Sequence, residues 1–263
     1  SLEEFKTIFW REWFHRFFAR LIGLVLILPF VYFLWFKKLS KNLVITMVII
    51  FFFGLFQAII GWWMVKSGLI DNPYVSAYRL AFHLTNALII FGLLFWLSLS
   101  LYFNKEKKYN KSKHIKPIFL LCLILLFITI ISGAFMAGTD AGKSFNTFPL
   151  MNEKFLPEGY FLTDYGWQNI FENTIAINFN HRWLAVSTFI LIFLVILYML
   201  FFDNANYHKS SLILVLIILF LQMCLGILTL INEVPLGFAS LHQTNSVLLL
   251  ASMLFAYHRL IYK

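Results

Sequence analysis

The stretch REWFHRFFARLIG, Arg11 to Gly23, places acidic, basic and imidazole side chains at the start of a long apolar run. A second stretch, NFNHRWLAVSTFI from Asn178 to Ile190, repeats the plan of His-Arg followed by apolar residues. Three residues before the histidine, the first copy has Glu12 and the second has Asn178. The repetition indicates a duplicated chain, and the difference indicates two related sites with different chemistry.

The composition around these stretches is that of a membrane protein. Of 263 residues, 61% are hydrophobic and only 13% are charged. A helix needs about 20 mostly apolar residues to cross a bilayer, whereas transmembrane β-strands are shorter and alternate in polarity. Seven stretches meet the helical requirement, at residues 14–36, 43–65, 77–103, 117–138, 175–202, 211–231 and 237–260. We therefore predict an all-α integral membrane protein.

The net charge of +9 is explained by the placement of lysines rather than by a nucleic-acid partner, which we exclude. Lysines cluster in KKLSKN (37–42) and NKEKKYNKSKHIK (104–116), and the chain ends with Arg259 and Lys263. These segments follow the first, third and seventh predicted helices, so they lie on one side of the membrane. The positive-inside rule makes that side cytoplasmic or its organellar equivalent.

Three signatures recur in the same order, at offsets of 166, 165 and 159 residues. They are His15-Arg16 with His181-Arg182, Gln57 and Gly61 with Gln222 and Gly226, and His83, Thr85 and Asn86 with His242, Thr244 and Asn245. The second copy is preceded by one more helix, so we expect a helix before Ser1 and eight in all. The predicted halves are parallel, pseudo-symmetric four-helix bundles: 1–103, then a basic inner loop, 104–116, then 117–263.

Four of the seven histidines, one pair in each half, are predicted to lie near the outer face of the membrane: His15, His83, His181 and His242. An ionisable residue inside a membrane span is a functional hypothesis by default. Neither cysteines nor carboxylates complete a zinc shell, whereas two imidazoles facing each other suit the axial positions of a haem iron. We therefore predict that the four histidines ligate haem iron, with the other three histidines in solvated or interfacial positions.

Small residues and arginines accompany these histidines. Four residues after each histidine comes Ala19, Ala87, Ala185 or Ser246. Such residues leave room for a flat macrocycle on that helix face, although small residues also promote ordinary helix contact. Arg16 and Arg182, with Arg20 or Arg79 as further candidates, are predicted to bind haem propionates; interfacial snorkelling is the other interpretation.

The acid in one copy alone distinguishes the two sites. Glu12 and His15 share a helix face because they are three residues apart. A carboxylate moves protons or stabilises developing positive charge, which the amide of Asn178 does poorly. The first half is therefore predicted to be reactive, with Glu12, His15 and His83 as its catalytic residues, and the second to hold a stable redox cofactor. The alternative is that Glu12 only pairs with Arg11 or Arg16.

The motifs EWFHR, FHLTN, SGAFMAGTDAGKSFNTFPLM (132–151), NFNHR and LHQTN together resemble those of haem A synthases. The resemblance is to the mitochondrial and α-proteobacterial subgroup, whose outward loops lack cysteine pairs. It implies a haem b between His181 and His242, and a haem O substrate held by His15 and His83. It further implies that a ring methyl of haem O becomes the formyl group of haem A through two hydroxylations, with haem b relaying electrons.

The resemblance also implies partners and a location. A haem O synthase and terminal-oxidase assembly factors are expected partners, while the electron donor and self-association into a homo-oligomer are left open. We expect a multi-pass protein surrounded by lipid in a bacterial inner membrane rather than a mitochondrial one. Two other classes fit parts of the pattern: a dihaem b-type electron-transfer cytochrome, and a proton-coupled transporter with a histidine relay.

Overall fold

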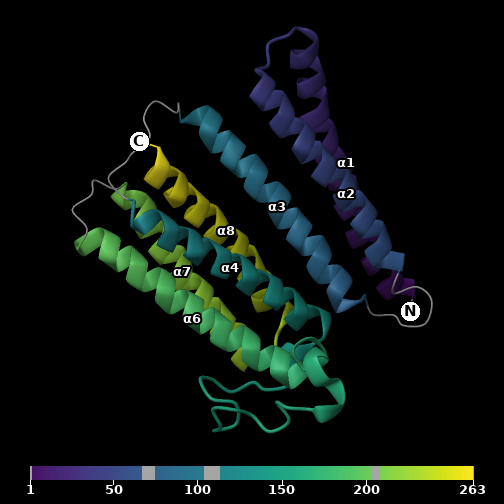
Figure 1. Ribbon diagram of the computed structural model, residues 1–263. Coiled ribbons are helices and arrows are strands. Elements are labelled where there is room, and N and C mark those ends of the chain that lie inside the picture. Colours follow the sequence, from purple (N-terminus) through teal and green to yellow (C-terminus); the bar gives the residue numbers. More distant parts are fainter. Residues whose placement is uncertain (1, 67–74, 104–112, 203–207, 263) are drawn as a thin grey trace. The chain divides into compact units, whose positions relative to one another are not determined.

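The computed structural model describes residues 2–66, 75–103, 113–202 and 208–262 (Figure 1). Within these residues the chain consists of helices, turns and one long loop, in which Met151 and Lys154 form an isolated β-bridge. The predicted basic loop 104–116 lies mostly outside the described residues, as do residues 67–74 between the second and third predicted helices.

All seven predicted stretches are helices. Six of them begin and end within two residues of the prediction, whereas α1 begins twelve residues before the predicted start. The early start of α1 is polar, with Lys6 donating to Glu3 at 2.9 Å, and an apolar run locates a span but not the beginning of its helix. The helices are α1 (Leu2–Trp35), α2 (Lys41–Lys66), α3 (Ala77–Tyr102), α4 (Ile115–Gly138), α6 (Thr174–Phe201), α7 (Lys209–Ile231) and α8 (Leu236–Ile261).

Six of these helices, all except α8, are long and apolar enough to cross a membrane. The 26 residues of α8 are long enough, but its first half carries the polar run HQTNS, residues 242–246. Those residues include the predicted ligand His242. This polar run distinguishes α8 from the other six helices in composition. That α8 crosses the membrane stays a prediction.

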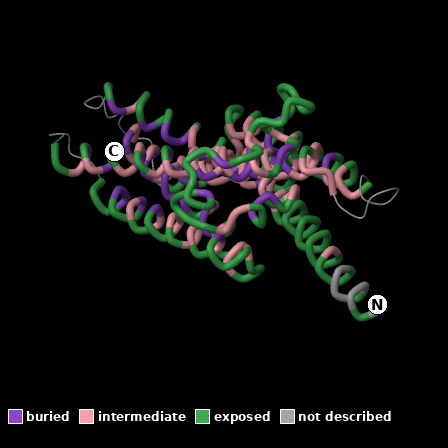
Figure 2. Tube along the Cα trace, turned by 90° about the horizontal axis from the view of Figure 1, so that it is seen from below, coloured by how far each residue is buried: buried purple, intermediate pink, exposed green. Residues whose placement is uncertain are grey.

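The chain forms two compact units, residues 1–59 and 60–263, which are described separately. In the first unit, α1 and the first part of α2 form a hairpin around a short turn at Lys37, which has φ = 50°. The rings of Phe30 and Phe51 lie 5.2 Å apart between the two helices. No residue in the spanning part of α1 is buried within the chain (Figure 2).

In the second unit, α4, α6, α7 and α8 form a four-helix bundle (Figure 1). Contacts run around the bundle from α4 to α6, from α6 to α7, from α7 to α8 and from α8 back to α4. Helices α6 and α8 are therefore diagonal partners, as are α4 and α7. Helix α3 packs outside this bundle, against α4 and α8.

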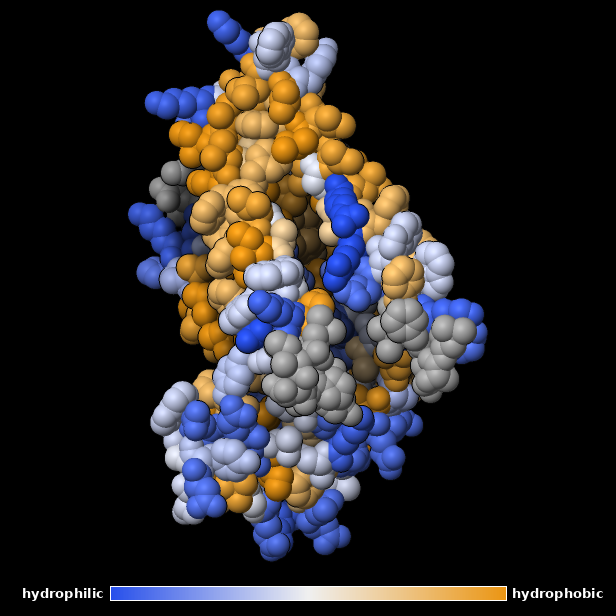
Figure 3. All heavy atoms as spheres, turned by 90° about the vertical axis from the view of Figure 1, so that its right-hand side faces the viewer, coloured by the Kyte–Doolittle hydropathy of each residue, from blue (hydrophilic) through white to orange (hydrophobic). Residues whose placement is uncertain are grey.

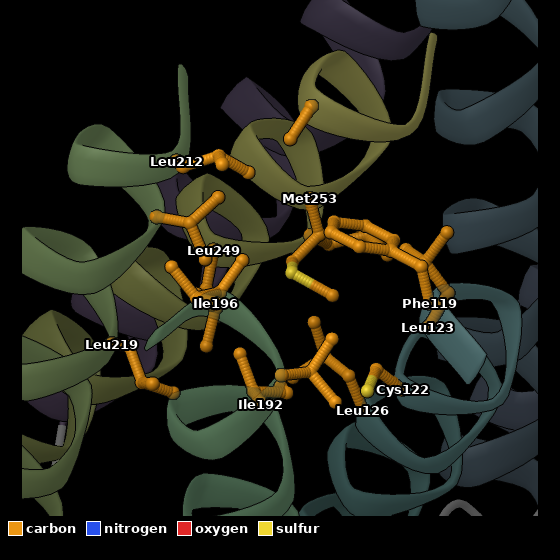
Figure 4. Packing of buried hydrophobic residues seen from close by; sticks show 14 of the residues in the cluster. Phe119, Cys122, Leu123, Leu126, Ile192, Ile196, Leu212, Leu219, Leu249 and Met253 are labelled. Carbon is orange, nitrogen blue, oxygen red and sulfur yellow. The ribbon is translucent and has the colours of Figure 1, made fainter. Parts of the chain in front are cut away.

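The apolar core fills one end of the bundle. On every one of the four helices, the core residues lie toward the end that we predict to be cytoplasmic. Figure 4 shows side chains of this cluster from all four helices, including Phe119, Ile196, Leu212 and Met253. Cys122 is 1% exposed and belongs to the same cluster, so it acts as a small packing residue. Of the predicted histidine ligands, His181 on α6 and His242 on α8 lie toward the other end.

A loop of 35 residues, 139–173, joins α4 to α6 at that other end. It contains three short helical segments: η1 (Ala141–Lys143), η2 (Thr163–Gln168) and α5 (Asn169–Glu172). Asn173 ends the loop and caps α6, because its side chain accepts from the N–H of Ile175 at 3.0 Å and donates to the carbonyl of Gly159 at 2.7 Å. Asn146 donates to the carbonyl of Leu230, at the end of α7, at 2.9 Å. The loop is thus attached to two helices of the bundle.

The exposed surface is largely apolar. Figure 3 shows hydrophobic residues over a large part of the face that it displays. On α4, for example, Leu121 is 48% exposed and Ile124 is 49% exposed. Apolar side chains that point away from the core of a helical bundle are expected where lipid tails, rather than water, surround the protein.

This difference between faces predicts unequal effects of Leu126→Ala and Leu121→Ala on α4. Leu126 is 4% exposed and lies in the core, so its truncation leaves a cavity. We expect a loss of about 2 kcal/mol, near the lower end for a buried leucine, because the side chain leaves lipid rather than water. Leu121→Ala should change stability by less than about 0.5 kcal/mol. Reversible unfolding in mixed micelles measures both, and equal losses would contradict the assignment of the two faces.

Candidate functional site

His181 lies on α6, next to the outer part of α4. Its Nδ1 is 2.7 Å from the hydroxyl oxygen of Ser132. Its ring also faces Gly133, where an added Cβ would lie 3.3 Å from the ring carbon Cε1. A serine and a glycine that are adjacent in sequence therefore position this imidazole, one through a hydrogen bond and the other through the absence of a side chain.

His242 lies on α8 and is positioned by α7. A Cβ at Gly226 would lie 2.8 Å from its Cε1, so only glycine accommodates the ring here. The amide nitrogen of Gln222 lies 3.4 Å from His242 Nε2, and its amide oxygen accepts from Asn245 at 2.8 Å. The buried Nδ1 of His242 has no hydrogen-bond partner. Gln222, Gly226, His242 and Asn245, which are all residues of the repeated signatures, therefore form one network of contacts.

The two imidazoles come from the diagonal helices α6 and α8 of the bundle. Small residues, Ser132, Gly133 and Gly226, lie beside their rings. Among the described residues, no group of three or more histidines, cysteines and carboxylates gathers to hold a metal ion. Two imidazoles on opposite helices, with glycine beside each, fit the axial ligands of a haem rather than a tetrahedral metal site.

Asn178 and Arg182 attach the long loop to α6. Asn178 is fully buried, and its amide donates to the carbonyl of Ala141 at 2.8 Å and to the hydroxyl of Ser144 at 3.0 Å. Its amide oxygen accepts from Arg182 Nε at 2.6 Å. Arg182 also donates to the backbone carbonyls of Phe145 and Thr147. We refer to these hydrogen bonds from Asn178 and Arg182 to loop residues 141–147 as the latch.

The latch explains why the second copy has an amide where the first has an acid. Asn178 donates and accepts at the same time, and a carboxylate only accepts. An acid here would place negative charge against the carbonyl oxygen of Ala141. Arg182, predicted to bind a haem propionate, makes three hydrogen bonds within the chain, so propionate binding stays a prediction.

In the first copy, the matching pair forms an ion pair. Glu12 accepts from Arg16 on α1, four residues later, just as Asn178 accepts from Arg182 on α6. Both side chains are partly exposed, in contrast to the buried Asn178. This geometry agrees with the alternative interpretation, in which Glu12 pairs with Arg16. The catalytic role of Glu12 stays a prediction. His15 is exposed on the same helix.

His83 repeats the arrangement of His242. A Cβ at Gly61 would lie 3.1 Å from Cε1 of His83, so the repeated glycine again faces the repeated histidine. Arg79, one turn earlier on α3, donates to the carbonyl of Trp63 at 2.8 Å and lies 4.4 Å from the centre of its ring. His15 and His83 belong to the two separately described units, so their pairing stays a prediction.

One of the other histidines departs from expectation. His258 was predicted to be solvated or interfacial, but it is fully buried on α8. Its ring packs edge-on against Trp96 at 5.0 Å and lies beside Tyr262, and its Nε2 is 3.5 Å from the hydroxyl of Ser100. Helix α3 covers this end of α8, which sequence position alone did not indicate.

Comparison with known proteins decides the family. Residues 1–254 match the family model described as "Cytochrome oxidase assembly protein". A "Heme A synthase" of Wolbachia pipientis subsp. Culex pipiens is 42% identical over 97% of this chain and 75% of its own length. Similar proteins of that name from Nitrosospira multiformis and Ehrlichia canis are each 40% identical, over 99% and 98% of this chain and 74% and 72% of their own lengths. The chain belongs to the haem A synthase family.

Within this member of the haem A synthase family, the sequence reasoning missed two residues that hold His181. Ser132 and Gly133 open the motif SGAFMAG, but the chain contains no second copy of it to compare. Gly61 and Gly226 were found because they recur at the same offset as their histidines. Repetition within the sequence was therefore the signal that identified Gly61 and Gly226. Ser132 and Gly133 on α4 have no repeated counterpart that could have identified them.

The latch predicts that Asn178→Asp destabilises this haem A synthase family member, although the side chain keeps its size. Two donated hydrogen bonds are lost and a buried charge faces a carbonyl, so we expect a cost of about 2–3 kcal/mol and faster proteolysis within residues 139–147. Asn180→Asp is the matched control, because Asn180 only accepts, from Tyr160 at 3.0 Å. Equal thermal stability and proteolysis of the two variants would contradict the latch.

Proposed function

We propose that this chain oxidises a ring methyl of haem O to a formyl group and so forms haem A, with a haem b bound between His181 and His242. The observation that carries the proposal is membership of the haem A synthase family over residues 1–254. That membership makes the chain an enzyme acting on haem O. The six apolar helices and the bacterial relatives support an integral protein of a bacterial inner membrane.

The second half supplies the proposed haem b site. His181 and His242 approach from diagonal helices, and Gly133 and Gly226 leave space beside their rings. The loop held by the latch begins directly after α4 and covers the start of α6, so it limits access of water to this end of the bundle. A bound haem b would supply one-electron redox chemistry here, and the protein would hold and insulate it.

The first half supplies the proposed substrate site. His15 and His83 are its proposed ligands to the iron of haem O, and Gly61 positions His83. Conversion of the methyl group to the formyl group is a net four-electron oxidation, R–CH3 + H2O → R–CHO + 4 H+ + 4 e−, which passes through an alcohol and a diol that loses water. An external electron acceptor, reached through the proposed haem b, would take up the electrons. Glu12, which forms an ion pair with Arg16, is the proposed group that accepts a proton or faces developing positive charge.

The division of the chain follows from this assignment. We propose a substrate half, 1–103, and a haem b half, 117–263, joined by the basic loop 104–116. Arg16 and Arg182 are the proposed contacts of the propionates, in addition to the partners they have within the chain. A haem O synthase would deliver the substrate, and oxidase assembly factors would receive the product.

The haem b site predicts that His181→Ala and His242→Ala lose haem b. The full chain, purified from a host that makes haem O but no haem A, should contain haem b with haem A or a hydroxylated haem O. Pigment extraction followed by chromatography and mass spectrometry identifies each. His208→Ala, at an exposed histidine, should keep the pigments of the parent chain. Two identical b haems per chain would instead indicate an electron-transfer cytochrome, and a colourless protein would exclude both functions.

The role of Glu12 predicts that Glu12→Gln accumulates haem O while retaining haem b. Losing a group that handles protons should lower haem A formation by about 100-fold or more. Glu3→Gln is the matched control, since Glu3 lies on the same helix and pairs with Lys6 three residues later. If both variants formed haem A at the parental rate, Glu12 would be only a surface ion-pair partner.

A further inference from the structure

Ser132 contacts both the backbone and His181. Its hydroxyl oxygen lies 2.8 Å from the carbonyl oxygen of Thr129 and 2.7 Å from His181 Nδ1. If Nε2 of His181 binds iron, Nδ1 must carry the proton, because a neutral imidazole has one N–H and one lone pair. Nδ1 would then donate to the Ser132 oxygen, and the Ser132 hydrogen would go to the Thr129 carbonyl, so both contacts are satisfied at once.

We propose that Ser132 is a positioning residue for the haem b site: its hydroxyl fixes the tautomer and ring plane of His181 and strengthens this imidazole as an iron ligand. The inference rests on the proposed function and deepens it. A hydrogen bond from the second ring nitrogen of a ligating histidine orients the ring and raises its basicity. Gly133 completes the arrangement, since the ring lies against a residue without a side chain.

His242 has no comparable side-chain hydroxyl at its buried Nδ1, so the two proposed ligands differ in their surroundings. The amide nitrogen of Gln222 lies 3.4 Å from His242 Nε2, the nitrogen that would bind iron. His181 is thus the proposed ligand whose second ring nitrogen contacts a side-chain hydroxyl.

The electronic consequence has a definite sign. A more basic imidazole donates more electron density and stabilises the oxidised iron relative to the reduced iron. Removing the Ser132 hydroxyl should therefore raise the reduction potential of haem b. We expect about a tenfold change in the ratio of oxidised to reduced haem at a fixed potential, which corresponds to about 59 mV for a one-electron couple.

The experiment is a potentiometric titration of haem b in the purified full chain, followed by visible absorption. Ser132→Ala should raise the midpoint potential, and Ser132→Thr, which keeps the hydroxyl, should restore the parental value. Ser252→Ala is the matched control: Ser252 is 5% exposed and makes the same kind of backbone hydrogen bond, to Leu249 at 2.8 Å, away from both histidines. Its potential should equal that of the parent chain.

Each outcome decides the inference. A parental potential in Ser132→Ala, or an equal shift in Ser132→Ala and Ser252→Ala, would overturn the role of Ser132 and leave the proposed function intact. A parent chain without haem b would overturn both. If Ser132→Ala does not fold, Ser132→Cys replaces the oxygen with a weak acceptor of similar size; a raised potential there but not in Ser132→Thr supports the inference, and parental values in both overturn it.

Discussion

The contact between a histidine ring and a glycine on a neighbouring helix is the constraint on which the site depends. It occurs at His83 with Gly61, at His181 with Gly133 and at His242 with Gly226. Between helices in lipid there is little hydrophobic driving force, so close association depends on small residues and on interhelical hydrogen bonds. A glycine opposite each ring provides the first, and Ser132 and Gln222 provide the second. Helix spacing and ring orientation are therefore set by the same residues.

The two ends of the four-helix bundle differ in the side chains that they contain. Toward one end, the helices interlock through large apolar side chains such as Phe119 and Ile196, which are fully buried. Toward the other end, they present small residues, amides and imidazoles. The packed end holds the four helices together through its apolar core, and the histidine end is where we propose that haem b binds.

The helices were predictable because each apolar run is long enough to cross a bilayer, even where polar residues interrupt it. The contacts of His242 with Gly226 and Gln222, and of Gln222 with Asn245, join residues that the repeat had already singled out. Iron ligation by His181 and His242 stays a prediction. The latch was not predictable, because Asn178 and Arg182 bind backbone carbonyls that leave no mark in the sequence. Burial of His258 was missed because it depends on α3 packing beside α8, a contact between residues far apart in the chain.

The latch binds mainly the main chain of the loop. Asn178 and Arg182 donate to the carbonyl oxygens of Ala141, Phe145 and Thr147, groups that every residue type provides, and Asn178 also donates to the hydroxyl of Ser144. Substitutions at Ala141, Phe145 and Thr147 can therefore leave the backbone hydrogen bonds in place, whereas one inserted or deleted residue between 141 and 147 shifts the carbonyls out of register. At these three positions the spacing along the chain matters more than the identity of the side chain.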